Sequence, residues 1–265
     1  MTALDQAFIN AYRQHDAVPM AAPVATAEFV RPSEPFPEEP MPAASQPFQP
    51  LLQVDGFAWP DSCRRLSAVA ETQLDALAEG LIAPTALGRK VFAACGCRRG
   101  SGCTTLLLCA AQRLARRGLR AILVDADFEQ PQLARRLGLL PDSGWEDVLD
   151  GQLPLGEVVI ESVDDHLAIL PLCGKHAGAD GSLAHDPAAE IDVLREHYDL
   201  VLVDLGRFAP ADGPAAQALC GAGRWIDAAV IVRDVRNANP PELDRLCDRL
   251  RRAGIAEAGL ADNFV

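Results

Sequence analysis

A series of continuously apolar runs, most of them separated by stretches with helical periodicity, constrains the fold of this chain more than any other feature. Because the apolar residues are continuous rather than alternating, the runs predict strands that are buried on both faces. Strands of this kind that alternate with helices predict an α/β domain with a doubly wound, mostly parallel sheet. The predicted strands are Val91–Cys95, Ala121–Val124, Leu167–Leu172, Leu200–Val203, Ala228–Val232 and Ala258–Asn263, and the predicted helices are 104–117, 187–197, 211–222 and 241–253.

Composition sets further bounds on the function. The chain has 265 residues, of which 49% are hydrophobic and only 5% aromatic, so one large domain with an aliphatic core and an appendage is expected. A net charge of −13 argues against nucleic acid as a partner, because binding phosphates along a duplex needs a concentrated basic surface. No apolar run reaches the roughly 20 residues that cross a bilayer, and no secretion signal is visible. We therefore expect a cytoplasmic protein without direct membrane insertion.

Three segments follow from the pattern along the chain. Residues 1–15 predict a short helix, which either docks on a partner or frays. Residues 16–60 are rich in Ala, Glu and Pro and lack an apolar period, so they predict a disordered linker. A helix over 61–82, with Leu66, Val69, Leu74, Leu77 and Leu81 turned inward, opens a domain that runs from residue 61 to 265.

The glycine-rich turn after the first of these strands predicts a phosphate-binding loop at Cys97–Thr105. The order strand, turn, helix is that of a P-loop, whose backbone N–H groups and helix N-terminus attract an anion. Aligned on G-x-x-x-x-G-K-[ST], Cys103 takes the place of the lysine and Thr104 that of the magnesium-binding hydroxyl. The loss of one such donor typically costs about 3–4 kcal/mol of transition-state stabilisation. The residues expected to bind nucleotide here are Arg98, Arg99, Gly100, Ser101, Gly102, Cys103, Thr104 and Thr105.

Acidic residues at the ends of two other predicted strands support this prediction over a plain helix-capping turn. Asp125 and Asp127 follow the second strand, and Asp204 ends a later one in the manner of a Walker B acid that holds magnesium. The carboxyl ends of parallel strands lie at one edge of a sheet, so these carboxylates are expected near the loop.

The three motifs together resemble those of the deviant-Walker ATPases, which include the Min and Par partitioning ATPases. The likeness spans about residues 61–265 and is strongest to the bacterial tyrosine kinases of capsular and extracellular polysaccharide export. It implies a P-loop NTPase fold that binds Mg-ATP or Mg-ADP, with Thr104, Asp125 and Asp204 at the magnesium. It also implies that Asp125, Asp127 and Asp204 would be the catalytic residues of an active enzyme.

Two further positions carry implied roles. Asn263, in the predicted last strand, is similar to an asparagine that contacts adenine in relatives, although a plain terminal polar residue would explain it equally. Arg98 stands where relatives have a signature lysine that reaches across a dimer interface. Arg98 and Arg99 could therefore clamp phosphate, or they could be a solvated pair.

Other features depart from the tyrosine kinases. The chain has only two tyrosines, Tyr12 and Tyr198, whereas those kinases usually end in a tail with several. The predicted helix at 61–82 also lacks the motif of regularly spaced arginines through which some of these kinases assemble into rings. We therefore expect a nucleotide-binding regulator with weak or lost catalysis, a pseudoenzyme. An active kinase that uses Arg98 or Arg99 and a scaffold that binds no nucleotide are the alternatives. The implied partner is a membrane polysaccharide co-polymerase or export protein, which would recruit the chain to the inner face of the membrane, and a homodimer is conceivable.

Eight cysteines without a CxxC pair indicate reduced thiols. Cys103 at a helix N-terminus is a candidate reactive thiol with a lowered pKa. A disulfide from Cys97 to Cys103 would block the loop. The same two cysteines are also explained as small residues that replaced others in a loop that no longer needs a lysine. No common zinc spacing is present, so a metal bound by the cysteines is not expected.

Overall fold

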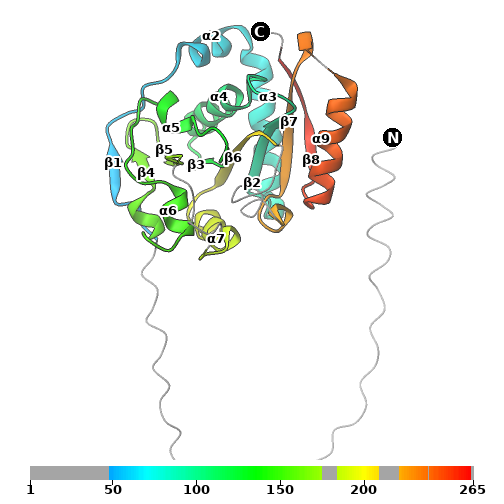
Figure 1. Ribbon diagram of the computed structural model, residues 1–265. Coiled ribbons are helices and arrows are strands. Elements are labelled where there is room, and N and C mark those ends of the chain that lie inside the picture. Colours follow the sequence, from blue (N-terminus) through cyan, green and yellow to red (C-terminus); the bar gives the residue numbers. More distant parts are fainter. Residues whose placement is uncertain (1–47, 175–183, 209–220, 238, 264–265) are drawn as a thin grey trace, which may run out of the picture. The chain divides into compact units, whose positions relative to one another are not determined.

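A computed structural model describes residues 48–174, 184–208, 221–237 and 239–263 (Figure 1). The predicted helix at 1–15, the linker as far as residue 47 and most of the predicted helix at 211–222 lie outside these residues. Among the described residues, no helix combines the length and the apolar character needed to cross a membrane.

The described part of the chain folds around one eight-stranded sheet with the strand order β1-β4-β5-β3-β6-β2-β7-β8 (Figure 1). Every neighbouring pair is parallel except β4 and β5, which are antiparallel. The sequence prediction of a doubly wound, mostly parallel sheet is confirmed. The strands are β1 (Leu52–Val54), β2 (Val91–Gly96), β3 (Ala121–Asp125), β4 (Ile160–Ser162), β5 (Leu167–Leu170), β6 (Leu200–Arg207), β7 (Ala228–Asp234) and β8 (Glu257–Asn263).

Helices cover both faces of the sheet, because successive side chains of each strand point to opposite sides. In β2, Val91, Ala93 and Cys95 join one apolar cluster, while Phe92 and Ala94 join the other. The first cluster includes residues of α6, α7 and α9, and the second includes residues of α2, α3, α4 and α5. The helices are α2 (Asp61–Val69), α3 (Glu71–Ile82), α4 (Cys103–Arg116), α5 (Leu133–Arg136), α6 (Trp145–Leu149), α7 (Pro187–His197) and α9 (Pro240–Arg252), with 3-10 turns η1 (Ala83–Leu87), η2 (Leu155–Glu157), η3 (Ala222–Arg224) and η4 (Val235–Asn237).

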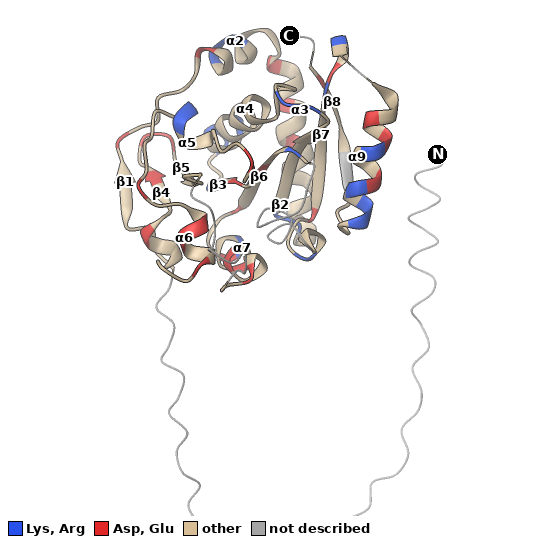
Figure 2. Cartoon of the chain, in the orientation of Figure 1, with Lys and Arg blue, Asp and Glu red and all other residues tan. Residues whose placement is uncertain are grey.

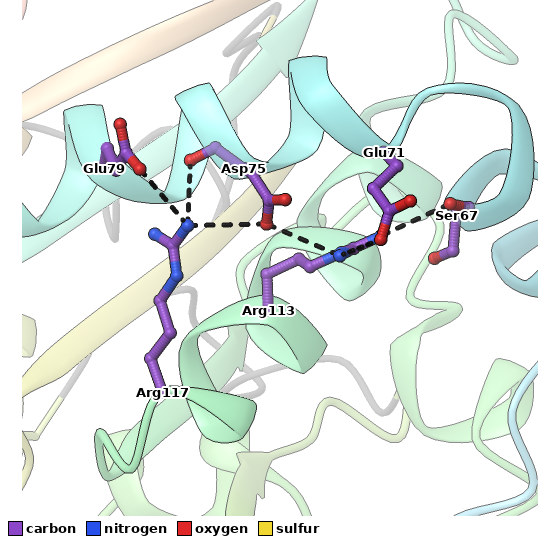
Figure 3. A network of polar contacts seen from close by, with 6 residues as sticks. All are labelled: Ser67, Glu71, Asp75, Glu79, Arg113 and Arg117. Atoms are coloured by element: carbon purple, nitrogen blue, oxygen red, sulfur yellow. Dashed lines mark hydrogen bonds and ion pairs between the residues drawn. The ribbon is translucent and has the colours of Figure 1, made fainter.

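An ion-pair network fastens α3 to α4 (Figure 3). Arg113 of α4 donates to the backbone oxygen of Ser67 at 3.3 Å and to the carboxylates of Glu71 and Asp75 at 3.3 and 3.4 Å. Arg117, just after α4, reaches Asp75 and Glu79 at 3.4 and 3.5 Å. The helix that carries the predicted phosphate loop at its start is thus held by its far end.

The structure corrects two expectations about the N-terminal half. The predicted helix at 61–82 is two helices, because the backbone leaves the helical region at Ala70, with φ −124° and ψ 35°. Val69 is consequently 80% exposed, whereas Leu74 and Leu81 point inward as expected. No proline or glycine marks the break, so the apolar pattern gave no sign of it.

The ordered fold also begins earlier than residue 61. Strand β1 pairs with β4, and the Asp165 carboxylate accepts hydrogen bonds from Phe57 N and Trp59 Nε1, both at 2.7 Å. Residues 48–60 are therefore part of the domain rather than linker. Strands β1 and β4 have only three residues each, which is too short for a recognisable apolar period.

Candidate functional site

The predicted phosphate loop joins the end of β2 to the start of α4. Gly100 and Gly102 have φ values of +77° and +99°, a region that residues with a Cβ rarely adopt. A side chain at Gly96 would clash with Ser101 Oγ, so the loop folds back over the end of its own strand. The backbone conformation of the loop therefore requires these glycines. The loop leads directly into the N-terminus of α4, which attracts anions.

Strand β8 holds the loop from the other side. Asn263 Nδ2 donates to the backbone oxygen of Ser101 at 2.9 Å, and a Cβ at Gly102 would lie 2.5 Å from the same nitrogen. Asn263, which the resemblance assigned to adenine recognition, thus lies at the loop. Its amide nitrogen contacts the loop backbone.

Cys103 is buried and neutral. Its side chain is 5% exposed and lies 3.2 Å from Ser101 Oγ, and burial, followed by the charge of Asp204, raises the pKa of its thiol to about 12. The expectation of a lowered pKa at this candidate reactive thiol is wrong, because the loss of hydration outweighs the attraction of the helix N-terminus. Burial also raises the pKa of Cys97, and both cysteines are free thiols.

Two buried carboxylates lie side by side below the loop. Asp125 and Asp204 are register partners on β3 and β6 and are 1% and 2% exposed. Burial raises the pKa of both carboxyl groups, and their mutual repulsion adds to the rise at Asp125. Thr104, the second residue of α4, donates its side-chain hydrogen bond to Asp204 and lowers that pKa in part. The structure therefore brings together the three residues predicted to hold magnesium.

Backbone groups fix the orientation of these carboxylates. Asp125 accepts from the N–H groups of Gln132 and Leu133 at 3.1 and 3.0 Å, and Asp204 accepts from Gly206 N at 3.0 Å. Asp125 therefore shapes the turn that follows β3 as well as facing its neighbour. Rigid anchoring of this kind is what a preorganised ligand needs.

Asp127 lies two residues after Asp125, just beyond the end of β3, and is half-buried. Its Oδ1 accepts from Gln130 N at 3.0 Å, and its other oxygen lies where a side chain on Gly206 would stand. Burial raises the pKa of this carboxyl group to about 6, which is close to the range in which a carboxylate can exchange protons at neutral pH.

The donor set fits a magnesium ion that arrives with phosphate. Among the described residues, no group of three or more His, Cys, Asp or Glu side chains could hold a metal alone. Magnesium usually takes one or two carboxylates, and water and substrate phosphates complete its octahedron. The Thr104 hydroxyl and the buried, acidic pair of Asp125 and Asp204 match that requirement, since two adjacent buried carboxylates favour a cation between them.

The two arginines of the loop are paired with carboxylates from distant segments. Arg98 donates through Nε and Nη2 to the two oxygens of Glu242 at 2.6 and 2.8 Å, and Arg99 Nη2 lies 2.8 Å from Glu129 Oε2. Arg207 lies 3.7 Å from the same oxygen of Glu129. The side chains of Arg98 and Arg99 thus point to neighbouring segments rather than to the backbone of the loop, and they are ion-paired rather than simply solvated. Their partners follow β3 and begin α9, and no spacing in the sequence links them to the loop.

A cavity of about 380 Å³ lies between the loop and the start of α9. Figure 2 shows acidic and basic residues distributed along α9, and Glu242 is the charged residue of this helix that lines the cavity. Sequence reasoning missed this cavity, although the polar run after β7 is a signal that could have indicated it. Among the residues that line it are Arg98, Ser101, Arg233, Asp234, Asn239 and Glu242.

Comparison with known sequences gives partial matches. No family model matches the chain. The succinoglycan biosynthesis transport protein ExoP of Rhizobium meliloti is 28% identical over 137 residues, which are 48% of this chain and 17% of ExoP. The chromosome-partitioning ATPase Soj of Thermus thermophilus is 40% identical over 106 residues, which are 40% of this chain and 41% of Soj. The matched regions thus span less than half of either relative.

Solved structures are similar over more of the chain. The BceF tyrosine kinase domain superposes with a TM-score of 0.60 at 22% identity and covers 80% of this chain and 93% of that domain. The septum site-determining protein MinD of Pyrococcus horikoshii, complexed with Mg-ADP, gives a TM-score of 0.51 at 21% identity over 65% of this chain and 69% of MinD. The chain has the P-loop NTPase fold of bacterial tyrosine kinase domains and MinD-type ATPases, and the matches to ExoP and Soj support a relationship to the Min/Par-type ATPases.

Proposed function

We propose that this chain binds Mg-ATP or Mg-ADP at the loop 98–105 and acts as a regulator in exopolysaccharide synthesis or export, with weak or lost phosphoryl transfer. One observation carries the proposal: Cys103, which we align with the lysine of the motif, is a buried, neutral thiol next to Thr104, which bonds to the buried Asp204. The residues that would hold magnesium lie together, whereas Cys103 would supply no charge to stabilise the transferring phosphoryl group.

Each residue has a separate part in this proposal. The loop amides and the N-terminus of α4 would bind the phosphates. Thr104, Asp125 and Asp204 would hold magnesium, which neutralises phosphate charge when it is bound. A neutral thiol adds no charge where negative charge grows during transfer, so binding can persist while turnover falls by about a hundredfold to a thousandfold.

The partner proposal follows the relatives. ExoP is by name a transport protein of succinoglycan biosynthesis, and BceF contributes a tyrosine kinase domain of the same fold. We propose a membrane polysaccharide co-polymerase or export protein as the partner, which would bring a cytoplasmic chain to the inner face of the membrane. Self-association as a homodimer is a second arrangement that the same site would allow.

Fluorescent ATP and ADP titrations with and without magnesium test the nucleotide proposal, together with assays of phosphate release and tyrosine phosphorylation. We expect magnesium-dependent binding without measurable turnover, and loss of the magnesium dependence in Asp204→Ala. The control is Asp244→Asn, because Asp244 is an exposed carboxylate of α9 that does not line the cavity. The absence of binding at millimolar nucleotide would refute the proposal and leave a scaffold.

A second candidate function is an active ATP-dependent tyrosine kinase or ATPase in which Arg98 or Arg99 replaces the lysine. Asp127 favours this candidate, because a carboxyl group with a pKa of about 6 suits a proton acceptor. Turnover that disappears in Asp127→Asn or Arg98→Ala would establish it over the regulator.

A further inference from the structure

One ion pair joins the phosphate loop to α9 at the cavity. Arg98 and Glu242 both line the cavity, are 144 residues apart in the sequence and meet through two hydrogen bonds of 2.6 and 2.8 Å. The Arg98 side chain is 51% exposed and that of Glu242 is 26% exposed, so no packed core holds either of them. The pair is therefore free to exchange its partners without loss of the fold.

The geometry makes the carboxylate a competitor for phosphate. Glu242 occupies the edge of the guanidinium that carries Nε and Nη2, and a two-pronged contact with a phosphate uses an edge of the same kind. The Arg98 charge also holds the pKa of Glu242 below its usual range, so the carboxylate stays ionised beside the space in which phosphate would lie. Glu242 and an incoming phosphate would therefore compete for the same guanidinium.

We propose that Glu242 is a positioning residue that gates the site: it holds Arg98 against α9, and a nucleotide binds by taking Arg98 from it. This inference rests on the proposed function, since it assumes that phosphate binds at the loop. It differs from a structural role because Glu242 would oppose ligand binding rather than support it. Exposed ion pairs contribute little to stability, so the gate would be weak and easily reversed.

The test measures nucleotide affinity in a double-mutant cycle on the full chain. We expect Glu242→Gln to raise the affinity for Mg-ADP about threefold to fivefold, and Arg98→Ala to lower it. In the Arg98→Ala background, Glu242→Gln should have no further effect, because there is no guanidinium left to release. Asp244→Asn removes the same charge from the same helix and should leave the affinity unchanged.

Hydrogen exchange of the loop amides supplies a readout that needs no nucleotide. We expect faster exchange at residues 98–101 in Glu242→Gln than in the unchanged protein or in Asp244→Asn, since the tether to α9 is lost. Arg98→Ala should give the same acceleration.

Each outcome separates the gate from the function on which it rests. Binding by the unchanged protein with no gain in Glu242→Gln overturns the gate alone. A gain that persists without Arg98 also overturns it, because Glu242 then acts only through its charge. Failure of both the unchanged protein and Glu242→Gln to bind overturns the proposed function as well, whereas binding by Glu242→Gln alone supports both.

Discussion

Two arginines near each end of helix α4 form ion pairs with distant carboxylates, and the two sets differ in burial. Arg113 and Arg117 at the C-terminal end bind the carboxylates of α3, and the Arg113 side chain is only 10% exposed (Figure 3). Arg98 and Arg99 in the loop before the helix are 51% and 43% exposed and each binds one glutamate. The same pairing chemistry is therefore buried between helices at one end and open to exchange at the other.

Burial decides what each pair can do. Arginines suit the C-terminal end of a helix because they oppose its dipole, and there they fix α3 on α4. At the N-terminal end a cation inside the loop would bind phosphate, but the residue inside is the neutral Cys103 and the arginines lie outside it. The comparison teaches that the positive charges near this loop lie on exposed arginines that a ligand can reach, whereas the arginine at the other end is part of the helix packing.

The largest expected effect comes from restoring a cation inside the loop. Cys103→Lys should raise the affinity for nucleotide or the rate of phosphate release about a hundredfold, since the ammonium group would meet the phosphates at the helix N-terminus. Calorimetric titration and a phosphate-release assay measure the two effects. Cys103→Met, which adds length without charge, is the control. No change in either quantity would mean that the loop geometry itself has departed from phosphate binding.

Removing the buried arginine at the other end should have the next largest effect. Arg113→Ala should lower the free energy of unfolding by about 2 kcal/mol, because it removes a largely buried stem and leaves Ser67 O without its donor. Urea unfolding followed by circular dichroism measures the change. Arg117→Ala, whose side chain is more exposed, should cost less than about 0.5 kcal/mol. Equal costs for the two would show that burial does not separate them.

The Asp127 carboxyl group should make stability depend on pH. Because its pKa in the folded protein is raised to about 6, the protonated form favours folding, and this contribution is lost as the pH rises through 6. Asp127→Asn should therefore be more stable than the unchanged protein at pH 8 by about 1 kcal/mol, after allowance for solvent screening, and equally stable near pH 4. Urea unfolding at both pH values without magnesium checks this. A difference that does not vary with pH would count against the raised pKa.

The smallest effect is expected at the exposed pair of the loop. Arg98→Ala should change the free energy of unfolding by less than about 0.5 kcal/mol, because a half-exposed ion pair is strongly screened. The same urea series measures it beside Arg113→Ala. A loss as large as that of Arg113→Ala would remove the contrast between the two ends of α4.

The sequence allowed the centre of the fold to be predicted, since long buried strands such as β3 and β6 have continuous apolar runs. The approach of Asp125 and Asp204 followed from the same reasoning, because both were expected at the carboxyl ends of parallel strands, although β6 continues beyond Asp204 to Arg207. The break at Ala70 and the short strand β1 were missed, because each depends on contacts with distant segments rather than on a local period.

Within the candidate site, the loop glycines and Thr104 could be recognised from their spacing. The state of Cys103 could not, because the sequence shows a helix N-terminus but not the burial that raises the pKa of the thiol. The partners of Arg98 and Arg99 were also invisible, since Glu242 and Glu129 approach only in the folded chain. The residue spacing of the loop was thus predictable, whereas the burial of its side chains and their pairing with distant residues were not.

The hydrogen bond from Asn263 to Ser101 crosses 162 positions of the chain. Because β8 is the last strand that the structure describes, the turn after β2 acquires this support only when nearly all of the described sheet has been synthesised. A ribosome-bound chain that has emerged only through α4 would hold the glycines and Thr104 but lack the brace. The proposed nucleotide site would then be complete only after β8 has joined the sheet.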